Sequence, residues 1–192
     1  METRQAWTLY HVGFEEIRRP DPHRGRSNAD FGPGFYLSAD RDFSLRWARE
    51  RRGADTILNA YELSTEGLRV KRLFRDAEWY DAIFRSRAGY PDALADWDVV
   101  VGPIANDTLY DTWGILTSGL LPPEQALALL RIGPEYIQTV VKAERAAARL
   151  HWLSAKRLDP AQIALGRASV AREEAEYQRL FAEAMERMNG EG

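Results

Sequence analysis

The apolar and polar positions of this chain are arranged in short stretches that predict strands. Each stretch is rich in β-branched and aromatic residues and is bounded by glycine, proline or small polar residues, as strands usually are. These strands are predicted at residues 7–11, 35–38, 56–63, 68–74, 97–101 and 135–141. The short apolar run at 97–101 is typical of a buried strand.

Other stretches repeat their apolar residues at helical spacing, and several of them follow a residue that can cap a helix. Helices are predicted near residues 40–52, 79–89, 106–116, 122–133, 142–150 and 160–188. In the first of them Phe43 and Trp47 are four residues apart and share one face. The segment 18–30 has two prolines, one glycine and four arginines, which predict an exposed loop.

The order of these elements favours an α+β fold. Several predicted strands are linked by turns that are too short for the crossover connections of a parallel sheet. The turn Gly32-Pro33-Gly34 enters a strand and not a helix, so it is neither a dinucleotide-binding fingerprint nor a phosphate-binding P-loop.

Composition and charge narrow the classes of function. The 26 Lys and Arg residues against 29 Asp and Glu give a formal net charge of -3, which disfavours non-specific binding to nucleic acid. At 192 residues and 45% hydrophobic content, the chain suits one packed domain or one domain with a tail. It has neither a membrane-spanning apolar run nor a signal-peptide pattern, so we expect a soluble, cytoplasmic protein that does not enter a membrane.

The sequence also limits the chemistry that the chain can perform. It contains no cysteine, which excludes thiolate nucleophiles and zinc–thiolate sites. Its three histidines, His11, His23 and His151, are far apart in sequence, so no metal site is expected. Any chemistry that the chain performs must therefore use carboxylates, hydroxyls, arginines or an organic cofactor.

Three chemically capable residues lie at the edges of predicted strands: His11, Tyr36 and Glu135. Taken singly, each has a structural interpretation. A histidine at a strand end commonly forms a structural hydrogen bond, a tyrosine beside a glycine turn commonly joins the core, and a glutamate at a strand start is commonly solvated.

Taken together, these residues stand in segments that resemble a known family. The segments 9–11 (LYH), 31–40 (FGPGFYLSAD) and 135–137 (EYI) resemble the three motif strands of ADP-ribosyltransferases of the His-Tyr-Glu type. That clade includes diphtheria toxin and the poly(ADP-ribose) polymerases. A closer resemblance is to a bacterial ADP-ribosyltransferase-like family of domains of unknown function, which also accounts for the stretches 78–81, 98–107 and 142–143.

The resemblance covers about residues 8–153 and implies a fold and a division of the chain. The fold is α+β, with an ADP-ribosyltransferase-like split β-sheet core and surrounding helices. The catalytic domain spans 1–158, and 159–192 form a C-terminal helical extension to which the resemblance does not apply.

The resemblance also implies NAD as the substrate, without a metal. Cleavage of the bond between nicotinamide and ribose develops an oxocarbenium-like cation, which a nearby carboxylate stabilises. By the resemblance, Glu135 binds the 2'-hydroxyl of the nicotinamide ribose and stabilises this cation. Tyr36 stacks on the nicotinamide ring, and His11 binds a hydroxyl of the adenosine ribose. The other expected NAD-binding residues flank these positions: Val12, Gly13, Gly34 and Phe35.

The expected activity is that of a toxin-like mono-ADP-ribosyltransferase, with an antitoxin-like partner or a homodimer formed through the C-terminal helix. Two alternatives stay open: a catalytically inactive module that binds NAD, ADP-ribose or a protein partner, and an NAD glycohydrolase. Retention of all three motif side chains favours an enzyme. Val12 favours the module, because the family usually has glycine directly after the motif histidine. Gly133 stands where arginine-specific transferases have Glu or Gln, which disfavours arginine as acceptor; the sequence does not otherwise identify the acceptor.

Overall fold

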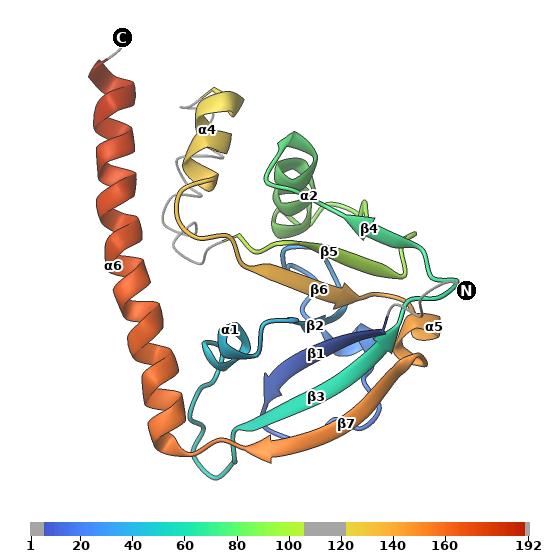
Figure 1. Cartoon of the computed structure of the whole chain (residues 1–192). Coiled ribbons are helices and arrows are strands. Elements are labelled where there is room, and N and C mark those ends of the chain that lie inside the picture. The colour runs from blue at the N-terminus through green and yellow to red at the C-terminus, as the bar shows by residue number, and fades with distance from the viewer. Residues whose placement is uncertain (1–5, 106–121, 191–192) are drawn as a thin grey trace.

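The computed structural model describes residues 6–105 and 122–190, and it contains two β-sheets with helices around them (Figure 1). The first sheet is antiparallel, in the order β1 (Ala6–Gly13), β3 (Ile57–Ser64) and β7 (Leu150–Arg157). The second has the order β2 (Phe35–Leu37), β6 (Ile137–Val141), β5 (Val99–Pro103) and β4 (Val70–Arg72), in which only β4 and β5 pair in parallel. The mixed architecture confirms the predicted α+β class.

The helices of the described residues surround these sheets. They are α1 (Arg41–Leu45), α2 (Ala77–Arg87), α4 (Pro123–Leu130), α5 (Glu144–Ala147) and α6 (Pro160–Gly190), together with a 3₁₀ turn at Pro22–Arg24. Asp40 and Asp76 cap α1 and α2, because their carboxylates accept hydrogen bonds from backbone N–H groups in the first turn. The predicted helix at 106–116, with Asn106 and Asp107 as candidate caps, lies outside the described residues.

Several sequence-based boundaries were wrong. The helix expected to reach Arg52 ends at Leu45, because the next three N–H groups bond to carbonyls three residues back, which is a tighter 3₁₀ pattern. The strand expected from Glu135 begins at Ile137. The helix expected at 142–150 is the single turn α5. The strand β7, which follows it, was missed.

The second sheet is buried on both faces. Between the two sheets, side chains from both of them form one apolar cluster, which includes Leu9, Leu37 and Val141. On the other face of the second sheet, Val140 packs with Phe31 and with Trp79 of α2. Burial on both faces explains why β5 is continuously apolar, as predicted for a buried strand.

The long helix α6 runs beside both sheets and contacts α1 and α4 (Figure 1). Ile163 joins a third apolar cluster, whereas Phe181 and Met185 pack on the cluster around Trp79. No helix in the described part of the chain is long and apolar enough to span a membrane. The proposed division of the chain at residue 158 stays a prediction.

We predict that Gly166→Ala destabilises the protein. Replacing a glycine inside a helix by alanine normally raises the free energy of unfolding by about 1 kcal/mol. A Cβ at Gly166, however, would lie 2.6 Å from the Leu45 carbonyl oxygen of α1. We therefore expect a loss of about 1–3 kcal/mol in the free energy of unfolding, measured by urea titration.

The control is Arg167→Ala, at an exposed position of the same helix, which should change the free energy of unfolding by less than about 0.5 kcal/mol. A stabilised Gly166→Ala protein would show that α6 does not approach α1 this closely.

Candidate active site

Three chain segments meet at Ser38. The backbone of Ser38 forms two hydrogen bonds with Tyr10 of β1, of 2.8 and 3.0 Å, and this bridge joins the two sheets. The buried Ser38 hydroxyl also donates to the carbonyl oxygen of Ile137 at the start of β6, at 3.1 Å. The segments that contain His11, Tyr36 and Glu135 therefore converge at one point of the fold.

His11 is held by a backbone oxygen of the neighbouring strand. Its Nδ1 lies 2.8 Å from the Tyr36 carbonyl oxygen, so Nδ1 carries the proton and Nε2 is left as an acceptor. The imidazole also packs against the Phe35 ring, with 4.5 Å between ring centroids. Burial lowers the pKa of His11 below its ordinary value, so the side chain is neutral at pH 7.

The Tyr36 side chain points to the opposite face of β2 from Phe35 and packs on the cluster that contains Phe31. Its hydroxyl donates to the Gly32 carbonyl oxygen at 2.7 Å and accepts from the Phe31 N–H at 3.0 Å. Burial raises the pKa of Tyr36 well above the usual range of a phenol. The His11 imidazole is thus bonded to the backbone carbonyl oxygen of Tyr36 and not to the Tyr36 side chain.

The neighbouring residues of the predicted NAD site have distinct orientations. Val12 packs with Leu58, on the opposite face of β1 from His11, so its side chain does not cover the imidazole. A Cβ at Gly13 would lie 3.2 Å from His11 Nε2. A Cβ at Gly34 would overlap Val140, so only glycine lets this turn lie flat on β6.

Glu135 precedes β6 in a turn that Arg75 holds. The Arg75 guanidinium donates to the carbonyl oxygens of Arg131, Gly133 and Pro134, at distances from 2.7 to 3.1 Å. Its Nε lies 3.8 Å from Glu135 Oε2. Burial lowers the pKa of Arg75, whereas the nearby carboxylate of Glu135 opposes this shift. The Glu135 side chain is 51% exposed and is accessible to a ligand.

Glu135 is not in contact with the other two motif residues. No hydrogen bond or ion pair within the described ranges joins it to His11 or Tyr36. Tyr36 lies opposite Val140 in the sheet, and at about 3.3 Å per residue Glu135 is on the order of 16 Å from Val140 along the chain. A ligand that touches all three residues must therefore bridge the gap between Glu135 and the other two.

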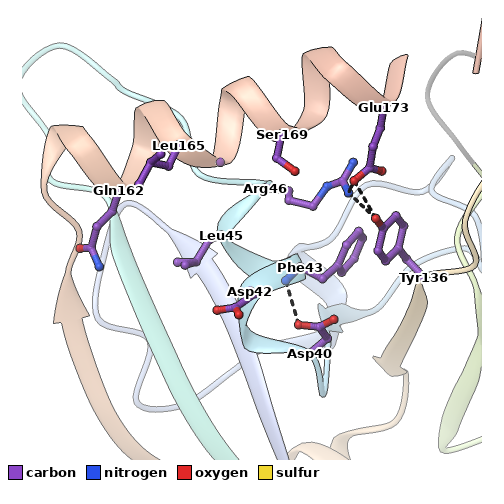
Figure 2. A pocket seen from close by; sticks show the side chains of 11 residues that line it. Asp40, Asp42, Phe43, Leu45, Arg46, Tyr136, Gln162, Leu165, Ser169 and Glu173 are labelled. Carbon is purple, nitrogen blue, oxygen red and sulfur yellow. Dashed lines mark hydrogen bonds and ion pairs between the residues drawn. The ribbon is translucent and has the colours of Figure 1, made fainter. Parts of the chain in front are cut away.

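A groove of about 440 Å³ lies beside the start of β6, between α1 and α6 (Figure 2). The Tyr136 ring stacks on Phe43 at 4.3 Å, and its hydroxyl donates to Glu173 of α6 at 2.8 Å. Arg46 donates to the Tyr136 hydroxyl at 2.6 Å and forms an ion pair with Glu173. Burial and the hydrogen bond to Glu173 raise the pKa of Tyr136.

Sequence reasoning missed Arg75, Arg46 and Glu173. Each is one charged residue among many in a polar stretch, and no local pattern distinguishes it. Among the residues that the structure describes, no group of three or more His, Asp or Glu side chains could hold a metal ion.

Comparisons with known proteins assign a family but no activity. The model of a family described as "Protein of unknown function (DUF3990)" matches residues 7–152. No curated protein matches the chain. One similar solved structure is the crystal structure of the M. tuberculosis MbcT–MbcA toxin–antitoxin complex. It has 15% identity and a TM-score of 0.44, and the match covers 86% of this chain and 91% of that chain. This similarity is too low to transfer a substrate or a partner.

We predict that His11 makes stability depend on pH. Its pKa in the folded protein lies below the ordinary value of 6.5, so the unfolded chain binds the proton more readily. The stability that neutral His11 contributes is complete above about pH 6.5 and is lost as the pH falls through the folded pKa. The free energy of unfolding should fall more steeply below about pH 6.5 in the unmutated protein than in His11→Gln.

Urea titrations across the pH range measure this difference, with the exposed His151→Gln as control. Parallel curves for the unmutated and His11→Gln proteins would contradict the burial of a neutral imidazole.

We also predict that Tyr36→Phe lowers the free energy of unfolding by about 1–3 kcal/mol. The substitution removes the acceptor of the Phe31 N–H, and the Phe31 residue is fully buried. Thermal or urea unfolding measures the loss. Tyr90→Phe, at a residue that is 55% exposed, is the matched control and should be nearly neutral. Equal stability of the two variants would mean that the Tyr36 hydroxyl does not hold the turn.

Proposed function

The chain belongs to the DUF3990 family of proteins of unknown function, and from its site we propose that it is an ADP-ribosyltransferase that cleaves the nicotinamide–ribose bond of NAD. The observation that carries the proposal is the convergence of the three motif segments at Ser38. His11, Tyr36 and Glu135 come from distant parts of the sequence. Each lies within three residues of Ser38 or of the two residues to which Ser38 bonds, Tyr10 and Ile137.

The proposed chemistry requires a negative charge near the reacting carbon. When the bond between the ribose C1' and the nicotinamide nitrogen breaks, its electron pair leaves with nicotinamide and the ribose becomes cationic. Glu135 is the exposed carboxylate for this role, and the arginine-held turn before it restricts its backbone. A fixed carboxylate stabilises the cation without reorganising in the transition state.

The other motif residues bind the dinucleotide. His11 Nε2 accepts a hydrogen bond from a ribose hydroxyl, because Nδ1 is engaged by the Tyr36 carbonyl. The Val12 backbone is available to the nicotinamide carboxamide, since the Val12 side chain packs on the other face of β1. The Tyr36 ring supplies an aromatic wall, which its bonded hydroxyl keeps in one orientation. Gly13 and Gly34 complete the contact surface, and Phe35, whose side chain lies on the other face of β2 from Tyr36, supports the His11 imidazole.

The two sheets fit the split core of this enzyme class. They are joined at the Tyr10–Ser38 bridge and pack against a common apolar cluster, and the motif residues lie around that bridge. The catalytic step ends when a nucleophile attacks the ribose C1' and loses its proton. The acceptor, the toxin-like role and the antitoxin-like or identical partner stay predictions.

The decisive test is Glu135→Gln. The amide keeps the size and much of the hydrogen bonding of the carboxylate but loses its charge, so turnover should fall by about a hundredfold or more. NAD affinity should change by less than about threefold, because the charge acts mainly in the transition state. Nicotinamide release measures turnover, and calorimetry measures NAD binding.

Glu124→Gln, at the exposed start of α4, is the matched control and should leave both quantities unchanged. If Glu135→Gln released nicotinamide at the unmutated rate, the proposed site would be wrong. Incubation of the unmutated protein with labelled NAD then distinguishes the transferase from the two alternatives. Nicotinamide release without a labelled acceptor identifies a glycohydrolase, and binding without release identifies an inactive module.

A further inference from the structure

The family model ends at residue 152, yet the helix beyond it reaches the proposed site. We propose that Glu173 of α6 is a positioning residue for Glu135 and acts on it through Tyr136. This inference rests on the proposed function. It makes α6 a part of the active site, whereas the sequence predicted an extension to the catalytic domain.

Tyr136 directly follows Glu135, so its orientation constrains the backbone of Glu135. The ring is stacked on Phe43 with 15° between the ring planes, which fixes the plane of the side chain. The hydroxyl donates to Glu173 Oε1 at 2.8 Å, which fixes the rotation of the tip. Figure 2 shows Glu173 reaching down from α6 to the Tyr136 hydroxyl, with Arg46 beside both.

Arg46 closes this contact into a triangle. It bonds to the Tyr136 hydroxyl and pairs with Glu173, and its guanidinium carbon lies 4.5 Å from the centre of the Tyr136 ring. The side chains of Arg46 and Glu173 are only 14% and 32% exposed, so water screens the pair weakly. A change at Glu173 would leave Arg46 without its carboxylate and Tyr136 without its acceptor.

Glu135 is therefore restrained from both directions along the chain. Arg75 holds the carbonyl oxygens of Gly133 and Pro134 before it, and the triangle of Arg46, Tyr136 and Glu173 holds the residue after it. A catalytic group has to be held within a fraction of an ångström, and a misplacement of about 1 Å can cost a hundredfold in rate. Loss of the α6 restraint should lower turnover more than NAD affinity.

The test compares Glu173→Ala and Glu173→Gln in the full-length protein. The alanine variant should lose about tenfold or more in kcat with less than about threefold change in KM for NAD. The glutamine variant keeps an oxygen that accepts from Tyr136 and should stay within about threefold of the unmutated kcat. The control is Glu176→Gln, on the same helix, whose carboxylate is 55% exposed and pairs with Arg179.

Amide hydrogen exchange gives a readout that does not depend on turnover. The segment 133–137 should exchange faster in Glu173→Ala than in the unmutated protein, while the amides of β1 and β3 keep their rates. If Glu173→Ala folds poorly, Tyr136→Phe takes its place, because it keeps the stacking on Phe43 and removes only the hydroxyl. Its kcat and exchange should change as those of the alanine variant do.

The outcomes separate the two proposals. If the unmutated protein releases no nicotinamide from NAD, the proposed function fails and the positioning role fails with it. If the unmutated protein is active but Glu173→Ala and Tyr136→Phe match it in kcat, only the positioning role is wrong. Unchanged exchange at 133–137, or a glutamine variant as slow as the alanine variant, also overturns the positioning role.

Discussion

The backbone bridge between Tyr10 and Ser38 determines where the two sheets meet. Its two hydrogen bonds connect β1 of one sheet to the end of β2 in the other, and Ser38 is fully buried, so water does not compete for them. His11 is one residue beyond this bridge and thereby reaches the carbonyl oxygen of Tyr36. The Ser38 hydroxyl extends the same junction to β6 and so to the turn before it.

Buried polar groups hold the turn that precedes Tyr36. Lys142 donates to the carbonyl oxygens of Phe31 and Pro33 and pairs with Asp92 at 2.8 Å. Burial lowers the pKa of Lys142, while Asp92 opposes that shift. A charge buried in this way is tolerated only when partners surround it, so its loss would leave the carbonyl oxygens of the turn unsatisfied. Lys142, which the family resemblance singles out, thus has a structural role in supporting the Tyr36 turn.

Local patterns predicted the elements whose residues interact with near neighbours. Asp40 and the FGPG turn before Tyr36 lie where the sequence indicated, because capping and turn formation depend on a few consecutive residues. The strand β7 was missed because its stability comes from pairing with β3, far away in sequence. The short strands β4 and β5 were both expected, but their parallel pairing in the second sheet was not.

The sequence by itself determined the fold class and most strands and helices, and it supplied the three candidate motif residues, because hydrophobic periodicity and short motifs are local properties of the chain. Only the tertiary structure decided what surrounds Glu135. Arg75 meets Pro134 across 59 residues, and Glu173 meets Tyr136 across 37. A single arginine or glutamate in a polar stretch has no local signature, since its partner is selected by how sheets and helices pack. The packing of α6 against α1 and the contact of Glu173 with Tyr136 therefore created a feature of the candidate site that no segment of the sequence encodes alone.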